Sequence, residues 1–186
     1  MQLPQLLLGL AATASAIDLY MHVNGCYTNP ALVCVNANPD RCCAGSVVDF
    51  FETVSARAIP PEWAIQVRGH SGGECRGTRE VSPARGVRDK CLSNGDFSGV
   101  GYGFNARKRS PAPQEQCAAE GGCTSSQKPD FLLLEDGSKY SVVDLGVDGL
   151  VELRVLGVVI GPSIKLAING ANATGIPAEF AALKVE

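Results

Sequence analysis

The sequence is poor in the residues that build metal and hydrolase sites. Its 186 residues include 2 histidines, His22 and His70, and none of its cysteines or histidines has the C-x-x-C or H-x-x-x-H spacing that holds a metal ion. We therefore expect no metal and no cofactor. With no partner motif beside it, His22 is interpreted as a surface or interface residue on a strand.

The chain has no net positive charge, and its late part has no long uninterrupted apolar run. The formal net charge is −3, which argues against nucleic acid as the main partner. The most apolar late stretch, Val142–Ile168, is interrupted by charged residues. We therefore expect no membrane span and no nucleic-acid partner.

The N-terminus has the pattern of a secretory signal peptide. Leu6–Ala12 is a short apolar run, only about half of the roughly 20 residues needed to cross a bilayer. Ala14-Ser15-Ala16 follows it as a small-x-small cleavage pattern. We predict that residues 1–16 are removed after Ala16 and that the mature protein is secreted and extracellular.

Eight cysteines dominate the exported part of the chain. An even number of cysteines in an oxidising compartment indicates disulfide bonds rather than metal ligands or catalytic thiols. Adjacent cysteines rarely bond to each other, so Cys42 and Cys43 are predicted to form bridges in different directions, while Cys117 and Cys123 most simply close a local loop. The predicted disulfide cysteines are Cys26, Cys34, Cys42, Cys43, Cys75, Cys91, Cys117 and Cys123.

A change of composition near residue 109 divides the chain. The basic residues 107–109 are followed by a Pro-rich polar stretch, which is typical of a linker. We predict a six-cysteine β-rich domain at 17–109 and a linker with a local disulfide loop at 110–130. Residues 131–186 would form a smaller hairpin and helix segment, either packed on the first domain or separate from it.

Strand patterns are frequent in the first segment. Ile17–Val23 alternates apolar and polar side chains, the signature of a half-buried strand. Further candidate strands, separated by Asn-Pro, Pro-Pro, Gly-Gly and Asn-Gly turns, are Leu32–Val35, Ser46–Phe51, Trp63–Arg68 and Gly99–Phe104. The predicted fold is mainly β (α+β overall), a disulfide-stabilised antiparallel sandwich or barrel with a short C-terminal helix.

The second segment mixes strand and helix signals. The sequence around Asp136-Gly137 predicts a hairpin over Phe131–Val143, with a tight primed turn. Residues 147–168 fit either a short helix at Val147–Leu156 or a second hairpin. Pro177–Leu183 is predicted to be the closing helix.

One short motif points to hydrolase chemistry. Gly69–Gly73 matches G-x-S-x-G with Ser71 as the nucleophile, and it follows a predicted strand. No helix pattern follows it, however, and no histidine comes after Ser71 to complete a Ser–Asp–His triad. We therefore expect a Gly-rich turn and no catalytic residue, and keep a small serine hydrolase as an alternative.

Two processing signals and one basic stretch remain. Asn172 begins the sole N-x-S/T sequon and is the predicted N-glycosylation site. Lys108-Arg109 is a dibasic pair of the type cut by kexin-like proteases. Six basic residues between Arg68 and Lys90 are interpreted as a solvated loop, with an anion-binding patch as the alternative.

Taken together, the export signal, the Cys26-x7-Cys34-x7-Cys42-Cys43 spacing and the Gly99–Phe104 stretch resemble the small secreted cysteine-rich proteins of filamentous fungi, from which effector candidates are drawn. We expect a secreted non-enzymatic protein that binds an extracellular protein or polysaccharide, effector-like or cell-wall associated. A toxin-like or antifungal precursor, cut at Lys108-Arg109, is the alternative.

Overall fold

The computed structural model describes residues 17–45, 51–73, 75–105, 123, 125–143 and 182–185. Several predicted features lie outside this part of the chain and stay predictions. They are the signal peptide ending at Ala16, the dibasic pair Lys108-Arg109, Cys117, the sequon at Asn172, strand residues 46–50, and the elements expected between 144 and 181.

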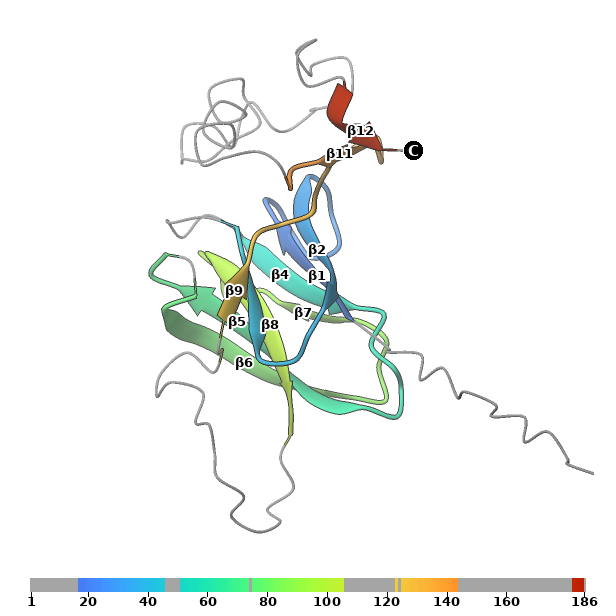
Figure 1. Cartoon of the computed structure of the whole chain (residues 1–186). Coiled ribbons are helices and arrows are strands. Elements are labelled where there is room, and N and C mark those ends of the chain that lie inside the picture. Colours follow the sequence, from blue (N-terminus) through green and yellow to red (C-terminus); the bar gives the residue numbers. More distant parts are fainter. Residues whose placement is uncertain are drawn as a thin grey trace, which may run out of the picture.

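The chain folds as two β-sheets packed face to face, mostly with antiparallel neighbours (Figure 1). This confirms the predicted mainly β, disulfide-stabilised sandwich. The larger sheet has the strand order β12-β11-β10-β2-β1-β4-β7. Its strands are β1 (Ile17–His22), β2 (Ala31–Ala37), β4 (Thr53–Arg57), β7 (Lys90–Leu92), β10 (Phe131–Leu133), β11 (Lys139–Ser141) and β12 (Lys184–Val185).

The smaller sheet has the order β6-β5-β8-β3-β9. In it β9 runs parallel to β3, whereas the other neighbours are antiparallel. Its strands are β3 (Arg41–Ala44), β5 (Ala64–Ser71), β6 (Gly77–Arg85), β8 (Gly99–Phe104) and β9 (Ser125–Gln127).

Alternation along β1 decides which of its side chains form the core. Ile17, Leu19 and Met21 point between the sheets and are fully buried. The residues between them, including Tyr20, lie on the outer face of the larger sheet. This outer face carries the pocket described below.

A row of glycines lies on the outer face of β8. Val100 and Tyr102 point into the core, and the Tyr102 hydroxyl donates to the carbonyl oxygen of Ala37 at 2.9 Å. Gly101 and Gly103 occupy the outward positions, where a Cβ would lie 2.9 Å from Cys123 Sγ and 2.5 Å from Arg68 Nη2, respectively. Side chains from neighbouring strands therefore lie across β8.

The adjacent cysteines of β3 form two bridges on opposite faces of the sheet. Cys43 points into the core and bonds to Cys34 of β2, which links the two sheets. Cys42 points outward and bonds to Cys75, just before β6. Neighbouring residues of a strand face opposite ways, so the adjacent pair anchors β3 on both sides.

The predicted hairpin at residues 131–143 is present as β10 and β11. Its turn differs from the expected two-residue primed turn. Leu134 and Ser138 are hydrogen bonded at 2.9 Å across a three-residue loop, with Gly137 at φ +82°. This is the loop type that places glycine in the left-handed position of a bulge.

β10 also pairs with β2 in the larger sheet, with Leu132 opposite Leu32. The chain beyond residue 123 therefore shares both sheets with the chain before residue 105. β9, which lies inside the predicted linker at 110–130, joins the smaller sheet, and β10 joins the larger one. Of the predicted closing helix, residues 177–181 lie outside the described part, and Ala182–Leu183 form a 3-10 turn that leads into β12.

The basic stretch between Arg68 and Lys90 is not the solvated loop that we predicted. It contains β6, an edge strand paired along β5, and Pro83 is tolerated there because an edge strand has one unpaired side. Arg68 lies on β5 and is buried, where it forms an ion pair with Asp40 at 2.8 Å.

Candidate functional site

The loop between β1 and β2 folds back over the outer face of the larger sheet. The Thr53 hydroxyl donates to the carbonyl oxygen of Asn24 at 2.9 Å. Cys26 is bonded to Cys91 of β7. The loop therefore crosses β4 and is covalently held at the edge of the sheet.

His22 lies beneath this loop, so its interpretation as a surface residue is wrong. Its side chain is fully buried. Nδ1 donates to the carbonyl oxygen of Thr28 at 2.6 Å, and Nε2 accepts from the Ser55 hydroxyl at 2.8 Å. Burial is the main cause that lowers the pKa of His22 to about 4, so the ring is neutral at pH 7 and fixes the loop to β4.

Arg57, at the end of β4, is held between two tyrosine rings. Its guanidinium carbon lies 4.4 Å from the centre of the Tyr20 ring and 5.1 Å from that of Tyr27. Tyr20 is diagonal to Arg57 across the β1–β4 pair, since Asp18 lies directly opposite Arg57. Tyr27 comes from the loop, next to the Cys26–Cys91 bridge.

Tyr27, Arg57 and Asp89 line an open pocket of about 320 Å³ on this face. The register of β4 and β7 places Ala56 opposite Lys90, which brings the preceding residue, Asp89, towards Arg57. Among the described residues, Nε and Nη2 of Arg57 have no hydrogen-bond acceptor, although both atoms are buried. The pocket therefore combines an aromatic ring, a guanidinium group and a carboxylate.

Charges of both signs lie around the pocket. Burial raises the pKa of Tyr20, with Asp18 as the next cause, and burial followed by Asp89 raises the pKa of Tyr27. Both hydroxyls therefore keep their protons at neutral pH. The positive charge of Arg57 stands close to the negative charges of Asp18 and Asp89.

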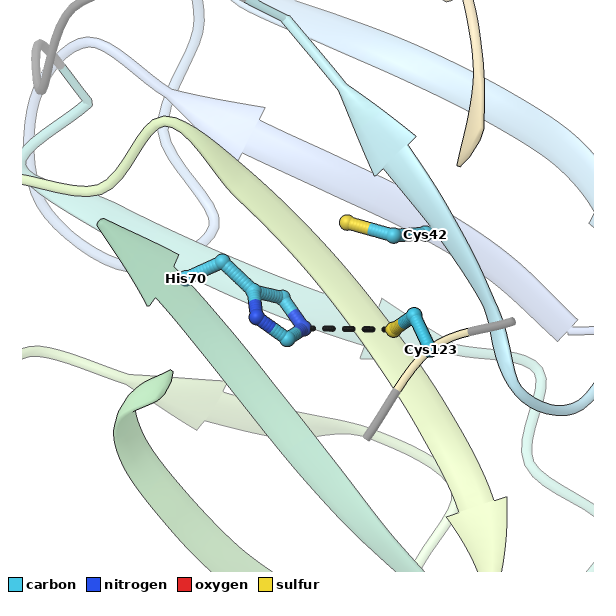
Figure 2. A group of neighbouring side chains, drawn as sticks. All are labelled: Cys42, His70 and Cys123. Carbon is cyan, nitrogen blue, oxygen red and sulfur yellow. Dashed lines mark hydrogen bonds between the residues drawn. The ribbon is translucent and has the colours of Figure 1, made fainter. Parts of the chain in front are cut away.

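A second group of reactive side chains lies on the outer face of the smaller sheet. Figure 2 shows Cys42, His70 and Cys123, whose ligand atoms all lie within 4.8 Å of one another. His70 Nε2 is 3.3 Å from Cys123 Sγ. Burial lowers the pKa of His70 to about 4, so its imidazole is neutral at pH 7.

Cysteine and histidine are common metal ligands, but not every sulfur in this second group is free to bind a metal ion. Cys42 is bonded to Cys75, and a disulfide sulfur is not a thiolate ligand. The three residues could hold a metal ion only after that bridge is reduced. Cys117 lies outside the described residues, so the predicted Cys117–Cys123 bridge stays a prediction.

The G-x-S-x-G motif forms a β-hairpin rather than a strand–turn–helix. Ser71 ends β5, Gly72 and Gly73 adopt φ of +81° and +82°, and β6 begins at Gly77. A nucleophile elbow needs a helix at this point. The observed context is that of the Gly-rich turn that we predicted.

The pocket was missed by the sequence reasoning, because its members come from three separate segments. The sequence does carry one signal. Tyr27 directly follows Cys26, and Asp89 precedes Cys91 by two residues, so a correct pairing of these cysteines would have brought both residues together.

The fold and these sites define a disulfide-stabilised β-sandwich protein with a small surface pocket. Residues 16–130 match the model of a family described as the ARB_05566_N N-terminal domain. The chain therefore belongs to this family, and the match covers the strands from β1 to β9. Searches of curated proteins and of solved structures gave no match.

Proposed function

We propose that this chain is a secreted, non-enzymatic protein that binds an extracellular partner, like the small cysteine-rich proteins of filamentous fungi that it resembles. The observation that carries the proposal is the pocket at Arg57, which a disulfide bridge helps to hold in place. A binding site needs fixed, accessible polar and aromatic groups, and this pocket supplies them in Tyr27, Arg57 and Asp89.

The disulfide bonds support an extracellular location. The bridges Cys26–Cys91, Cys34–Cys43 and Cys42–Cys75 tie together loops and both sheets. Such bonds persist in oxidising compartments and are rare in the cytosol. Within the described residues, no helix has the length and apolar character to cross a membrane.

The proposal is tested first by expression of the whole chain in a secreting fungal host. Intact mass spectrometry of the medium, with and without reduction, should show a protein beginning at Ile17 with its bridges formed. A mass that shows cutting at Lys108-Arg109 would favour the precursor alternative. Failure to appear in the medium would overturn the proposed location.

Binding is tested next with the secreted protein itself. It should sediment with insoluble fungal or plant cell-wall material, and a reduced and alkylated sample should not. A Ser71→Ala variant should be retained equally, since Ser71 lies in a hairpin turn of the other sheet. Ester, peptide or glycan hydrolysis that disappears with Ser71→Ala would contradict non-enzymatic action.

A further inference from the structure

We propose that the pocket lined by Tyr27, Arg57 and Asp89 is a binding site for a neutral saccharide. The inference rests on the proposed binding function and adds the chemical class of the ligand. At about 320 Å³ the pocket lies at the small end of the range for ligand sites, and it opens directly to the surface. A unit of a larger polysaccharide can therefore enter it while the rest of the polymer stays outside.

The polar groups of the pocket can form hydrogen bonds with two neighbouring hydroxyl groups of a sugar. Arg57 can only donate hydrogen bonds, whereas the Asp89 carboxylate can only accept them. Sugar hydroxyls do both, so one can accept from Arg57 while the next donates to Asp89. Arg57 lines the pocket, although its Nε and Nη2 are buried and have no acceptor among the described residues.

The aromatic part of the pocket suits the C–H face of a sugar ring. Arg57 lies against the Tyr27 ring, and 47% of Tyr27 remains exposed. A ring with an apolar face and polar edges can pack on this tyrosine and still reach the charged groups beside it. The exposed ring thus provides the contact area that a small polar ligand needs.

The presence of both signs of charge favours a neutral ligand over an ion. Asp89 lines the pocket, and Asp18 lies opposite Arg57 in the sheet. A sulfate, phosphate or carboxylate drawn to Arg57 would meet these two negative charges. A cation drawn to Asp89 would meet Arg57.

The site is also organised before the ligand arrives. Arg57 is fixed between Tyr20 and Tyr27, and the Cys26–Cys91 bridge holds the loop that carries Tyr27. Side chains that are already ordered lose less entropy when a ligand binds. This compensates in part for the small contact area.

The test is calorimetric titration of the secreted, disulfide-intact protein with neutral oligomers of glucose, mannose and N-acetylglucosamine, up to millimolar concentration. At least one of them should bind, with an affinity that changes little with NaCl concentration. Tyr27→Ala and Asp89→Asn should each weaken this binding by about ten-fold or more. Tyr27→Phe should keep most of it, because the ring remains.

Arg85→Ala is the matched control, since it removes an exposed arginine from β6 of the other sheet and should leave binding unchanged. Arg57→Lys keeps the charge but loses the planar edge, and it should weaken binding without unfolding the protein, as checked by its thermal midpoint. Wild-type affinity in both Tyr27→Ala and Asp89→Asn would overturn the inference.

Heparin serves as the anionic probe. Tighter binding of heparin by Asp89→Asn, with no binding of any neutral oligomer by the wild type, would show an anion site and would also overturn the inference. The proposed function fails separately, if the wild-type protein is not exported or is not retained by cell-wall material. Retention that is unaffected by all pocket variants would leave that function standing and remove only the saccharide site.

Discussion

Both histidines of this chain are buried and neutral, although they make different contacts. His22 joins the β1–β2 loop to β4 through two hydrogen bonds, and His70 lies against Cys123. Burial is the largest cause that lowers both pKa values, from 6.5 to about 4. Each histidine therefore takes up a proton more readily in the unfolded chain than in the folded one.

This difference makes stability depend on pH. Because the folded pKa is depressed, the unfolded state binds more protons below pH 6.5, and stability falls as the pH decreases from 6.5 towards 4. A full shift of this size corresponds to roughly 3 kcal/mol for each histidine. Urea unfolding at neutral pH and near pH 4.5 should show the loss.

His22→Gln keeps a neutral polar group and removes one titration. We expect the variant to lose distinctly less stability than the wild type over the same pH interval. An equally steep loss in the variant would show that His22 does not contribute to it.

The absence of a side chain at Gly103 leaves room for the ion pair between Arg68 and Asp40. An added Cβ would lie 2.5 Å from both Arg68 Nη2 and Asp40 Oδ1, closer than real Cβ contacts allow. Gly103→Ala should therefore push the pair apart, and because both atoms are the far ends of flexible side chains, the expected loss of unfolding free energy is about 1 kcal/mol or less. Gly25→Ala is the control, because nothing lies within 4 Å of its added Cβ. Equal midpoints for the two variants in urea would contradict this reading.

At the level of strands and loops, a strand could be predicted from the sequence where apolar and polar residues alternate regularly along it. β1 and β8 were predicted because apolar residues occupy every second position, as in Ile17, Leu19 and Met21. β6 was missed because it is an edge strand whose few apolar residues do not alternate with polar ones. β3 was missed because its pattern is that of two adjacent cysteines, one for each face.

The pocket could not be predicted for a different reason. Its residues come together only through the strand order β1-β4-β7 and the Cys26–Cys91 bridge. Six cysteines allow many pairings, and the sequence does not choose among them. Local patterns thus predicted the fold class, whereas the site depends on long-range pairing.

The Cys26–Cys91 bridge should stabilise both the fold and the pocket. Its sequence separation is 65, and closing a loop of that length removes unfolded-state entropy worth about 4 kcal/mol. Cys26→Ser with Cys91→Ser should lower the unfolding free energy by about that amount or somewhat less. Hydrogen exchange in the loop that carries Tyr27 should become faster. Unchanged exchange there would show that the hydrogen bonds of His22 and Thr53 hold the loop without the bridge.

At the level of the whole molecule, the two sheets are each completed by strands from beyond residue 123. β9 pairs with β3 in the smaller sheet, and β10 pairs with β2 in the larger one. Buried side chains of this later part include Leu132, Leu134 and Tyr140. The three bridges described above, in contrast, all join residues before 105.

Cutting the purified protein at Lys108-Arg109 should therefore leave its two parts associated. We expect the cut and uncut forms to elute together in gel filtration, since strand pairing and buried apolar surface remain. The cut form should separate in urea without a reducing agent. A Lys108→Ala, Arg109→Ala chain, treated with the same protease, is the control. Separation of the parts in native buffer would contradict the shared sheets.

The pairing of β9 and β10 with earlier strands has one more consequence for such a cut form. Its folding would become a second-order reaction between two chains, and its stability would rise with protein concentration. The assembled form would therefore persist at high protein concentration, and dilution would separate it into two chains.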